Sequence, residues 1–110
     1  MPKKGRAQAI TPAEFAVLES LCELGVGTVA AVHAALPAQR RVSYNTVLTQ
    51  VRFLHAKGFL EREALGRAHL YRPKVSLDQA RRKALTEFLG DYFGGDRDAM
   101  LALLREPSGS

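Results

Sequence analysis

The sequence predicts a mainly α-helical fold with one small β-hairpin. Five stretches carry apolar residues at helical spacing, and several of them begin at a residue that caps helices. After the third stretch the pattern changes, and two short segments of strand-like composition are separated by a glycine turn. The predicted order is therefore three helices, a hairpin and two further helices.

The first helix is predicted to begin at Thr11 and to end before Gly25. Thr11 can cap it, Pro12 suits its first position, and Glu14 can reach back to the Thr11 amide in a capping box. Residues with helical spacing then form an apolar side. They are Phe15, Leu18, Leu21, Cys22 and Leu24.

A second, shorter helix is predicted over residues 28–36 and a third over residues 43–57, with a short polar connection between them. The hairpin strands are predicted at residues 59–64 and 68–72, joined by a turn at Gly66. Three helices followed by a hairpin are the winged helix-turn-helix arrangement, in which the second and third helices form the helix-turn-helix pair. The hairpin is the wing.

The C-terminal part of the chain is predicted to be helical and to form a dimer. A second capping box, Ser76 with Gln79, starts a long helix that ends at residues 94–95, and a short helix begins near Asp96. These two helices could fold back and pack their apolar side chains into the core of the winged helix. A winged helix is already complete without them, so we expect a two-fold dimer. The predicted dimerisation residues are Leu85, Phe88, Leu89, Tyr92, Phe93, Met100, Leu101, Leu103 and Leu104.

The predicted domain organisation follows from these elements. Residues 1–10 form a basic N-terminal arm, residues 11–74 the winged-helix domain, residues 75–106 the helical dimerisation region, and residues 107–110 a disordered tail.

The third helix has two chemically different sides. At ~100° per residue, its apolar side chains gather on one side, which we expect to be buried. They are Tyr44, Val47, Leu48, Val51 and Leu54. Thr46, Thr49 and Phe53 fall on the opposite side, with Asn45 and Arg52 on its flanks. Hydroxyl, amide and guanidinium groups read base edges in the major groove, and no carboxylate lies between residues 43 and 57 to repel phosphates. A solvent-exposed side that merely lacks acids is the alternative.

The charge distribution also indicates a polyanionic partner. The net charge is +5, and residues 1–74 hold 11 Lys and Arg against 5 Asp and Glu, whereas residues 75–110 hold 5 against 6. The first two thirds of the chain therefore carry the whole excess. Gly66 permits a tight turn that would place Arg67 at or beside the wing tip. The predicted contacts to the DNA backbone are Lys3, Lys4, Arg6, Arg40, Arg41, Lys57 and Arg67.

Composition and motifs exclude several other classes of protein. Apolar residues make up 46% and charged residues 25%, and no apolar run approaches the ~20 residues that span a bilayer. The single cysteine, Cys22, fits a reducing compartment, so we expect a cytoplasmic protein. His33, His55 and His69 lack any ligand spacing, and no catalytic motif is present. We therefore expect no enzyme activity, no cofactor and no metal site.

Four motifs resemble the penicillinase and methicillin-resistance repressors, the BlaI/MecI/CopY family. They are TPAEFAVLESLCELG (11–25), SYNTVLTQVRFLHAKGFL (43–60), GRAHLYRP (66–73) and FGG (93–95). The resemblance implies a homodimeric repressor that binds a palindromic DNA operator and is released through a sensor protease pathway. By position, it implies base readout by Ser43, Asn45, Thr46, Thr49 and Arg52, and a wing contact by Arg67.

The sequence departs from the family pattern at named positions. Phe53 stands where members often carry arginine, and Ala102-Leu103 replaces the Asn-Phe pair at the cleaved bond of the β-lactam repressors. The paired C-terminal cysteines of the copper-responsive branch are absent from the sequence. A winged-helix module that binds proteins, without specific DNA binding, is the alternative function.

Overall fold

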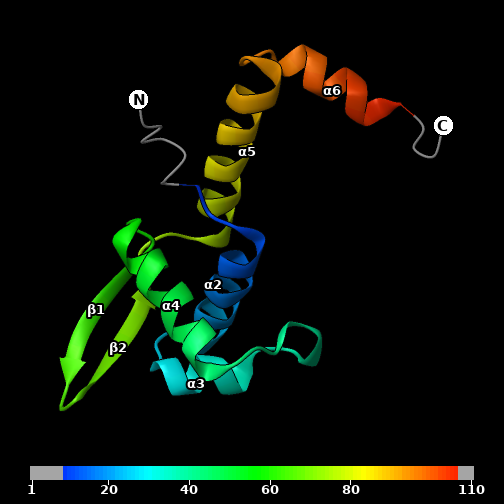
Figure 1. Cartoon of the computed structure of the whole chain (residues 1–110). Coiled ribbons are helices and arrows are strands. Elements are labelled where there is room, and N and C mark those ends of the chain that lie inside the picture. Colours follow the sequence, from blue (N-terminus) through cyan, green and yellow to red (C-terminus); the bar gives the residue numbers. More distant parts are fainter. Residues whose placement is uncertain (1–8, 107–110) are drawn as a thin grey trace.

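The computed structural model describes residues 9–106, so the predicted tail and the arm residues Lys3, Lys4 and Arg6 lie outside the described residues. The described elements are α2 (Pro12–Leu24), α3 (Val29–Ala35), the 3-10 turn η1 (Ala38–Arg40), α4 (Tyr44–Ala56), β1 (Leu60–Leu65), β2 (Ala68–Pro73), α5 (Leu77–Phe93) and α6 (Arg97–Arg105). Figure 1 shows α2, α3, α4 and the hairpin at one end of the molecule, with α5 and α6 extending from it. The predicted mainly helical class with a small hairpin is confirmed, and each predicted strand differs from the observed one by about one residue at its ends.

The predicted helix ends form as the local sequence requires. The Thr11 hydroxyl accepts a bond from the Glu14 amide at 3.1 Å, and the Glu14 carboxylate accepts one from the Thr11 amide at 3.1 Å. Ser76 and Gln79 form the same reciprocal capping box at the start of α5. Gly94, with a φ of +59°, ends α5 in the left-handed region that disfavours other residues.

The core lies where α2, α3, α4 and the hairpin meet. Its buried residues are Val17, Leu18, Leu21, Val29, Val32, Leu36, Val47, Val51, Leu54, Phe59, Leu60, Tyr71 and Ala80. The prediction that Tyr44 belongs to the buried side of the third helix is wrong, since its side chain is 46% exposed. Tyr44 is the first residue of α4, and its ring lies edge-on to His33 with 6.0 Å between the centroids.

The wing is attached to the rest of the domain by backbone hydrogen bonds. β1 and β2 pair antiparallel from Leu60 opposite Pro73 to Leu65 opposite Ala68. Tyr71 of β2 also exchanges two bonds of 2.8 and 2.9 Å with Gly27, in the connection between α2 and α3. The wing is therefore fixed to the connection between α2 and α3, just before the helix-turn-helix pair.

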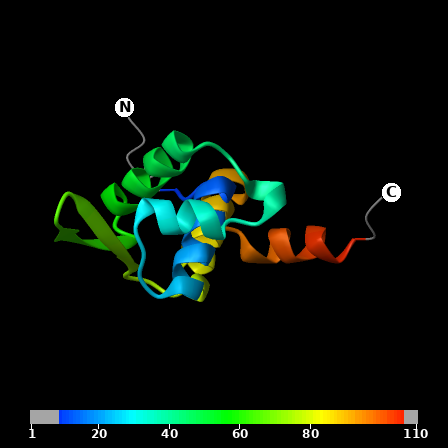
Figure 2. The same ribbon diagram turned by 90° about the horizontal axis from the view of Figure 1, so that it is seen from below.

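The C-terminal helices extend away from this core. Within α5, Ala80 is the only buried residue, and α6 has none. Figures 1 and 2 both show α6 projecting away from α2, α3 and α4. The radius of gyration is 16.2 Å, whereas a compact chain of this length has about 13 Å. The excess comes from the part of α5 beyond its first turns and from α6, which extend from the core (Figure 1).

Candidate nucleic-acid interface

The exposed side of α4 carries the residues for which base contacts were predicted. Val47, Val51 and Leu54 are wholly buried and hold α4 to the core. The five predicted residues are all exposed. They are Ser43, Asn45, Thr46, Thr49 and Arg52. The local sequence therefore places hydrogen-bonding side chains on the free surface of the second helix of the helix-turn-helix pair, which is the position that enters the major groove in this fold.

Ser43 and Thr46 are held in place by each other. The Ser43 hydroxyl caps α4 by accepting a bond from the Thr46 amide at 3.1 Å, and it lies 2.9 Å from the Thr46 hydroxyl. Ser43 thus has a structural role as a helix cap in addition to the predicted contact. Both hydroxyls remain exposed at the N-terminal end of the helix.

A shallow hollow lies beside this surface, between α4 and the start of α2. Its lining residues are Thr11, Glu14, Asn45, Thr46, Thr49, Gln50 and Phe53. Glu14 is the acidic residue among them, but it is 3% exposed and its carboxylate is paired with a lysine ammonium. The hollow therefore presents little negative charge to a DNA backbone.

Lys57 was predicted to contact the DNA backbone, and the structure gives its ammonium other partners. Its Nζ donates to the Glu14 carboxylate at 2.8 Å and to the Ala9 carbonyl at 2.7 Å. Its side chain is only 16% exposed. A mostly buried ammonium that already has two partners is less available to a phosphate than an exposed one, so Lys57 stays a prediction with weaker support than Arg67. This pairing joins residues far apart in the sequence, so local patterns gave no sign of it.

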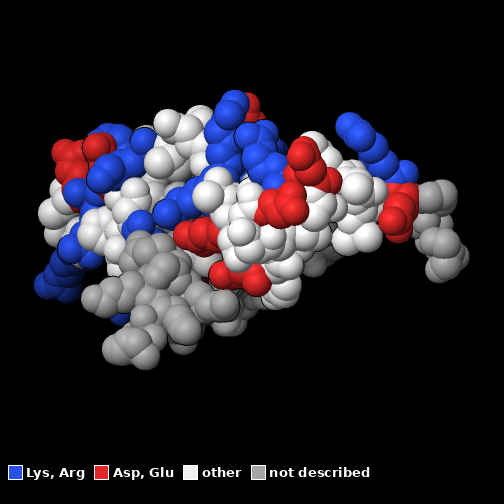
Figure 3. Space-filling view, turned by 90° about the horizontal axis from the view of Figure 1, so that it is seen from above, with Lys and Arg blue, Asp and Glu red and all other residues white. Residues whose placement is uncertain are grey.

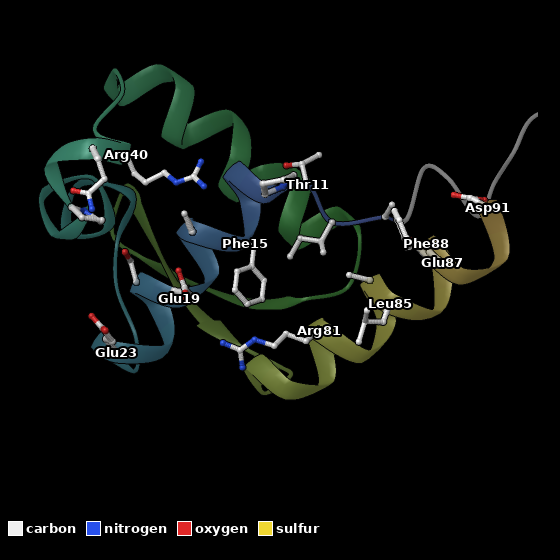
Figure 4. A pocket seen from close by; sticks show the side chains of 18 of the residues that line it. Thr11, Phe15, Glu19, Glu23, Arg40, Arg81, Leu85, Glu87, Phe88 and Asp91 are labelled. Carbon is white, nitrogen blue, oxygen red and sulfur yellow. The ribbon is translucent and has the colours of Figure 1, made fainter. Parts of the chain in front are cut away.

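The other predicted backbone contacts lie on different surfaces. Arg67 is exposed in the two-residue turn at the tip of the wing, after Gly66 with a φ of +60°. Arg41 donates to the Leu36 carbonyl at 3.1 Å, where it covers the end of α3. Arg40 lines a groove beside α2, as Figure 4 shows. The structure thus does not gather these arginines into one patch.

That groove lies between α2 and α5, reaches the connection between α3 and α4, and has a volume of about 1460 Å³. Figure 4 shows Phe15 of α2 pointing toward α5, with Arg81 and Leu85 opposite it and Phe88 further along. The Arg81 guanidinium lies 5.3 Å from the centre of the Phe15 ring, a cation–π distance. The groove is mainly apolar and opens beside the uncovered side of α5.

The surface viewed from above carries charges of both signs (Figure 3). Figure 3 shows Lys and Arg side chains interspersed there with Asp and Glu side chains. This mixture provides no continuous basic track for a phosphate backbone. The acid-free helix therefore remains the better candidate for a DNA-binding surface.

Residues 9–106 were also compared with the requirements of a metal site, a reactive thiol and a membrane-spanning helix. No group of three or more His, Cys, Asp and Glu side chains is placed there to hold a metal ion. Burial raises the pKa of the Cys22 thiol, and the Glu19 carboxylate adds to this effect. No helix in the described part is long and apolar enough to cross a membrane.

Comparison with known proteins identifies the family. The model of the penicillinase repressor family matches residues 10–108. None of the curated proteins compared with the chain matches it. The solution structure of the DNA-binding domain of the repressor BlaI is 25% identical, covers 69% of this chain and 89% of its own, and superposes with a TM-score of 0.57.

Other solved structures share the fold. The YusO protein from Bacillus subtilis is 20% identical, covers 90% of this chain and 72% of its own, and has a TM-score of 0.57. A mutant of MarR from E. coli is also 20% identical, with 86% and 72% covered and a TM-score of 0.56. Together with the family match, the acid-free α4 and the wing identify a winged-helix transcriptional repressor. The chain belongs to the penicillinase repressor family.

Proposed function

We propose that this repressor acts as a homodimer on a palindromic operator, with α4 in the major groove and the wing on the adjacent backbone. The observation that carries the proposal is the chemistry of α4. Its buried side is held by Val47, Val51 and Leu54, and its exposed side offers amide, hydroxyl and guanidinium groups without a carboxylate. These are the groups that distinguish base pairs in the major groove.

The individual side chains suit different contacts. The Asn45 amide can pair bidentately with adenine, and the Arg52 guanidinium can pair with guanine or a phosphate. Thr46 and Thr49 each offer a hydroxyl and a methyl group to a base edge. Ser43, at the N-terminus of the helix, would contact the backbone or the first base while it caps α4.

Phosphate contacts would come from the wing and from the connection before α4. Arg67 at the wing tip is the best placed, since nothing in the described residues pairs with its guanidinium. Arg40 and Arg41 remain in the proposal as exposed cations in the α3–α4 connection. The arm residues Lys3, Lys4 and Arg6 complete the proposed set.

The dimer would form through α5 and α6. Leu85, Phe88, Tyr92, Leu103 and Leu104 are between 47% and 73% exposed. Side chains of this size seldom form one continuous exposed surface on a monomer. A second copy related by a two-fold axis would cover these residues and the adjoining groove between α2 and α5, and it would present two copies of α4 to two half-sites.

Induction by a sensor protease is an expectation from the family resemblance. The corresponding bond, between Ala102 and Leu103, lies inside α6. Proteases prefer exposed, irregular segments, so α6 would have to unwind before cleavage there.

The proposal is tested by binding of the full chain to fluorescent duplex DNA across a salt series. We expect selection from a random pool to enrich an inverted repeat, and affinity for it to fall steeply with salt because cations are released from the phosphates. If the chain binds no duplex even at low salt, the proposal is wrong and the protein-interaction module becomes the better explanation.

A further inference from the structure

Phe53 is a large apolar side chain on the polar side of α4, and the contacts proposed so far leave it without a role. It is 52% exposed, although α4 buries Val51 and Leu54 completely. We infer that Phe53 is a specificity-determining residue whose ring contacts the 5-methyl group of a pyrimidine in the operator. The inference rests on the proposed function, because it requires α4 to lie in the major groove.

The position of Phe53 along the helix fits this contact. Asn45, Thr49 and Phe53 are spaced four residues apart and therefore form one row on the surface of α4. At a rise of ~1.5 Å per residue the row is about 12 Å long, so its two ends would lie beside different base pairs, which are ~3.4 Å apart along the duplex. All three residues line the hollow beside α2. Phe53 would therefore meet the bases at the opposite end of the row from Asn45.

The chemistry of the ring restricts what it can read. A phenyl group neither donates nor accepts a hydrogen bond, so it cannot recognise the donors and acceptors of the base edges. The one apolar group in the major groove is the methyl at C5 of thymine. 5-Methylcytosine offers the same methyl group at the same place.

One cation lies close to the exposed ring of Phe53. The Lys57 ammonium lies 6.0 Å from the ring centroid, one helical turn further along. That ammonium is fixed by the Glu14 carboxylate and the Ala9 carbonyl, so the ring rests against an anchored cation. A purely structural role, in which Phe53 only shields this ion pair from water, is the competing explanation.

Single-atom changes in the DNA separate the two roles. The operator is first obtained by selection with the full wild-type chain, and each thymine is then replaced in turn by deoxyuridine, which removes the methyl group and keeps every hydrogen-bonding group. We expect one thymine in each half-site at which wild type loses affinity by roughly fourfold, the factor that burial of one methyl group corresponds to. Phe53→Ala should bind the thymine and uracil versions equally, and Phe53→Leu should keep part of the difference.

Two further arms complete the experiment. In one arm, cytosine–guanine or 5-methylcytosine–guanine replaces that thymine–adenine pair. Wild type should bind the methylated DNA more tightly than the unmethylated DNA, and Phe53→Ala should bind both equally. Val26→Ala, which shortens an apolar side chain 39% exposed in the α2–α3 connection, is the matched control and should respond to uracil as wild type does.

Each other outcome overturns the inference. If wild type binds every uracil version as tightly as the thymine operator, there is no methyl contact. If Phe53→Ala loses as much affinity on uracil DNA as wild type does, another residue contacts the methyl group. A fall in melting temperature with equal loss of affinity for thymine and uracil DNA assigns Phe53 the structural role. Failure of wild type to enrich any sequence is a different result, which overturns the proposed function itself.

Discussion

Lys57 at the end of α4 and Glu14 in the first turn of α2 form a mostly buried ion pair, with 2.8 Å between Nζ and Oε1. The same carboxylate accepts a bond from the Thr11 amide, so Glu14 both caps α2 and holds the far end of α4. The pair therefore fixes the C-terminal end of α4 to the N-terminal end of α2.

Removing one partner of this pair should destabilise the fold. Lys57→Met leaves the Glu14 carboxylate buried without its counter-charge, and we expect a loss of about 3 kcal/mol in the free energy of unfolding. Urea denaturation followed by circular dichroism measures it. The double variant Glu14→Gln/Lys57→Met should recover much of the loss, since glutamine keeps the capping box and no charge remains buried. A double variant as unstable as Lys57→Met alone would show that the ion pair is not the cause.

Thr49 tests the placement of the recognition surface. Thr49→Glu adds a carboxylate to the exposed side of α4, where it would repel the phosphates, and it removes the proposed base contact of Thr49. We expect at least a tenfold loss of operator affinity by fluorescence anisotropy, with an unchanged melting temperature. Thr49→Ser is the matched control, and it should lose only the contact of the methyl group. Wild-type affinity in Thr49→Glu would mean that DNA binds to another surface.

Arg67 tests the role of the wing. Arg67→Ala should weaken binding to all sequences alike, and it should reduce the slope of log K against log salt concentration by about 1. A salt titration of the full chain on specific and random duplexes measures both effects. Arg82→Ala removes another exposed arginine, in α5, and should leave the slope unchanged. If both variants change the slope equally, the effect is one of net charge.

The dimer can be tested on α6. Leu101→Asp/Leu104→Asp places two charges on its exposed apolar side, and we expect the mass measured by light scattering to fall from twice 12.1 kDa to 12.1 kDa. Operator affinity should fall with it, because two half-sites are no longer bound together. Arg105→Ala, on the same helix, should remain dimeric. A wild-type chain that is monomeric at micromolar concentration would contradict the proposed dimer directly.

Cys22 should be a slow-reacting thiol. Burial raises its pKa and the Glu19 carboxylate raises it further, so the reactive thiolate is scarcer at neutral pH than in a free cysteine. We expect alkylation by iodoacetamide at pH 7 to be slower than that of a cysteine peptide and to accelerate as the pH rises above 9. Mass spectrometry over time gives the rate, and a reaction faster than the peptide would point to a sensor thiol.

The helices and the wing were predictable because their signals are local. Thr11, Ser43 and Ser76 cap helices through bonds to residues three positions away, and the glycines at the helix ends act within a single turn. Most of the buried side of α4 followed from its period, but Leu48 is only partly buried and Tyr44, the first residue of the helix, is exposed. Patterns that repeat along one element are thus sufficient to place most of the fold.

The details of the site depend on contacts between distant segments. The sequence around Lys57 does not indicate its ion pair with Glu14. The sequence around Gly27 does not indicate its backbone pairing with Tyr71 of the wing. The directions in which Arg40 and Arg41 point depend on the turn η1, which no periodicity describes. The sequence therefore predicts which residue types reach the surface of α4, but it does not predict which partners the surrounding lysine and arginine side chains have.

The attachment of α5 has a mechanical consequence. Ala80 is the buried residue that joins this helix to the domain, and Phe93 at its other end lies thirteen residues beyond it, or about 20 Å. A rotation of about 10° at Ala80 would therefore displace that end by about 3.4 Å, the length of one base-pair step. In the proposed dimer, small changes in packing at this alanine would therefore change the distance between the two copies of α4.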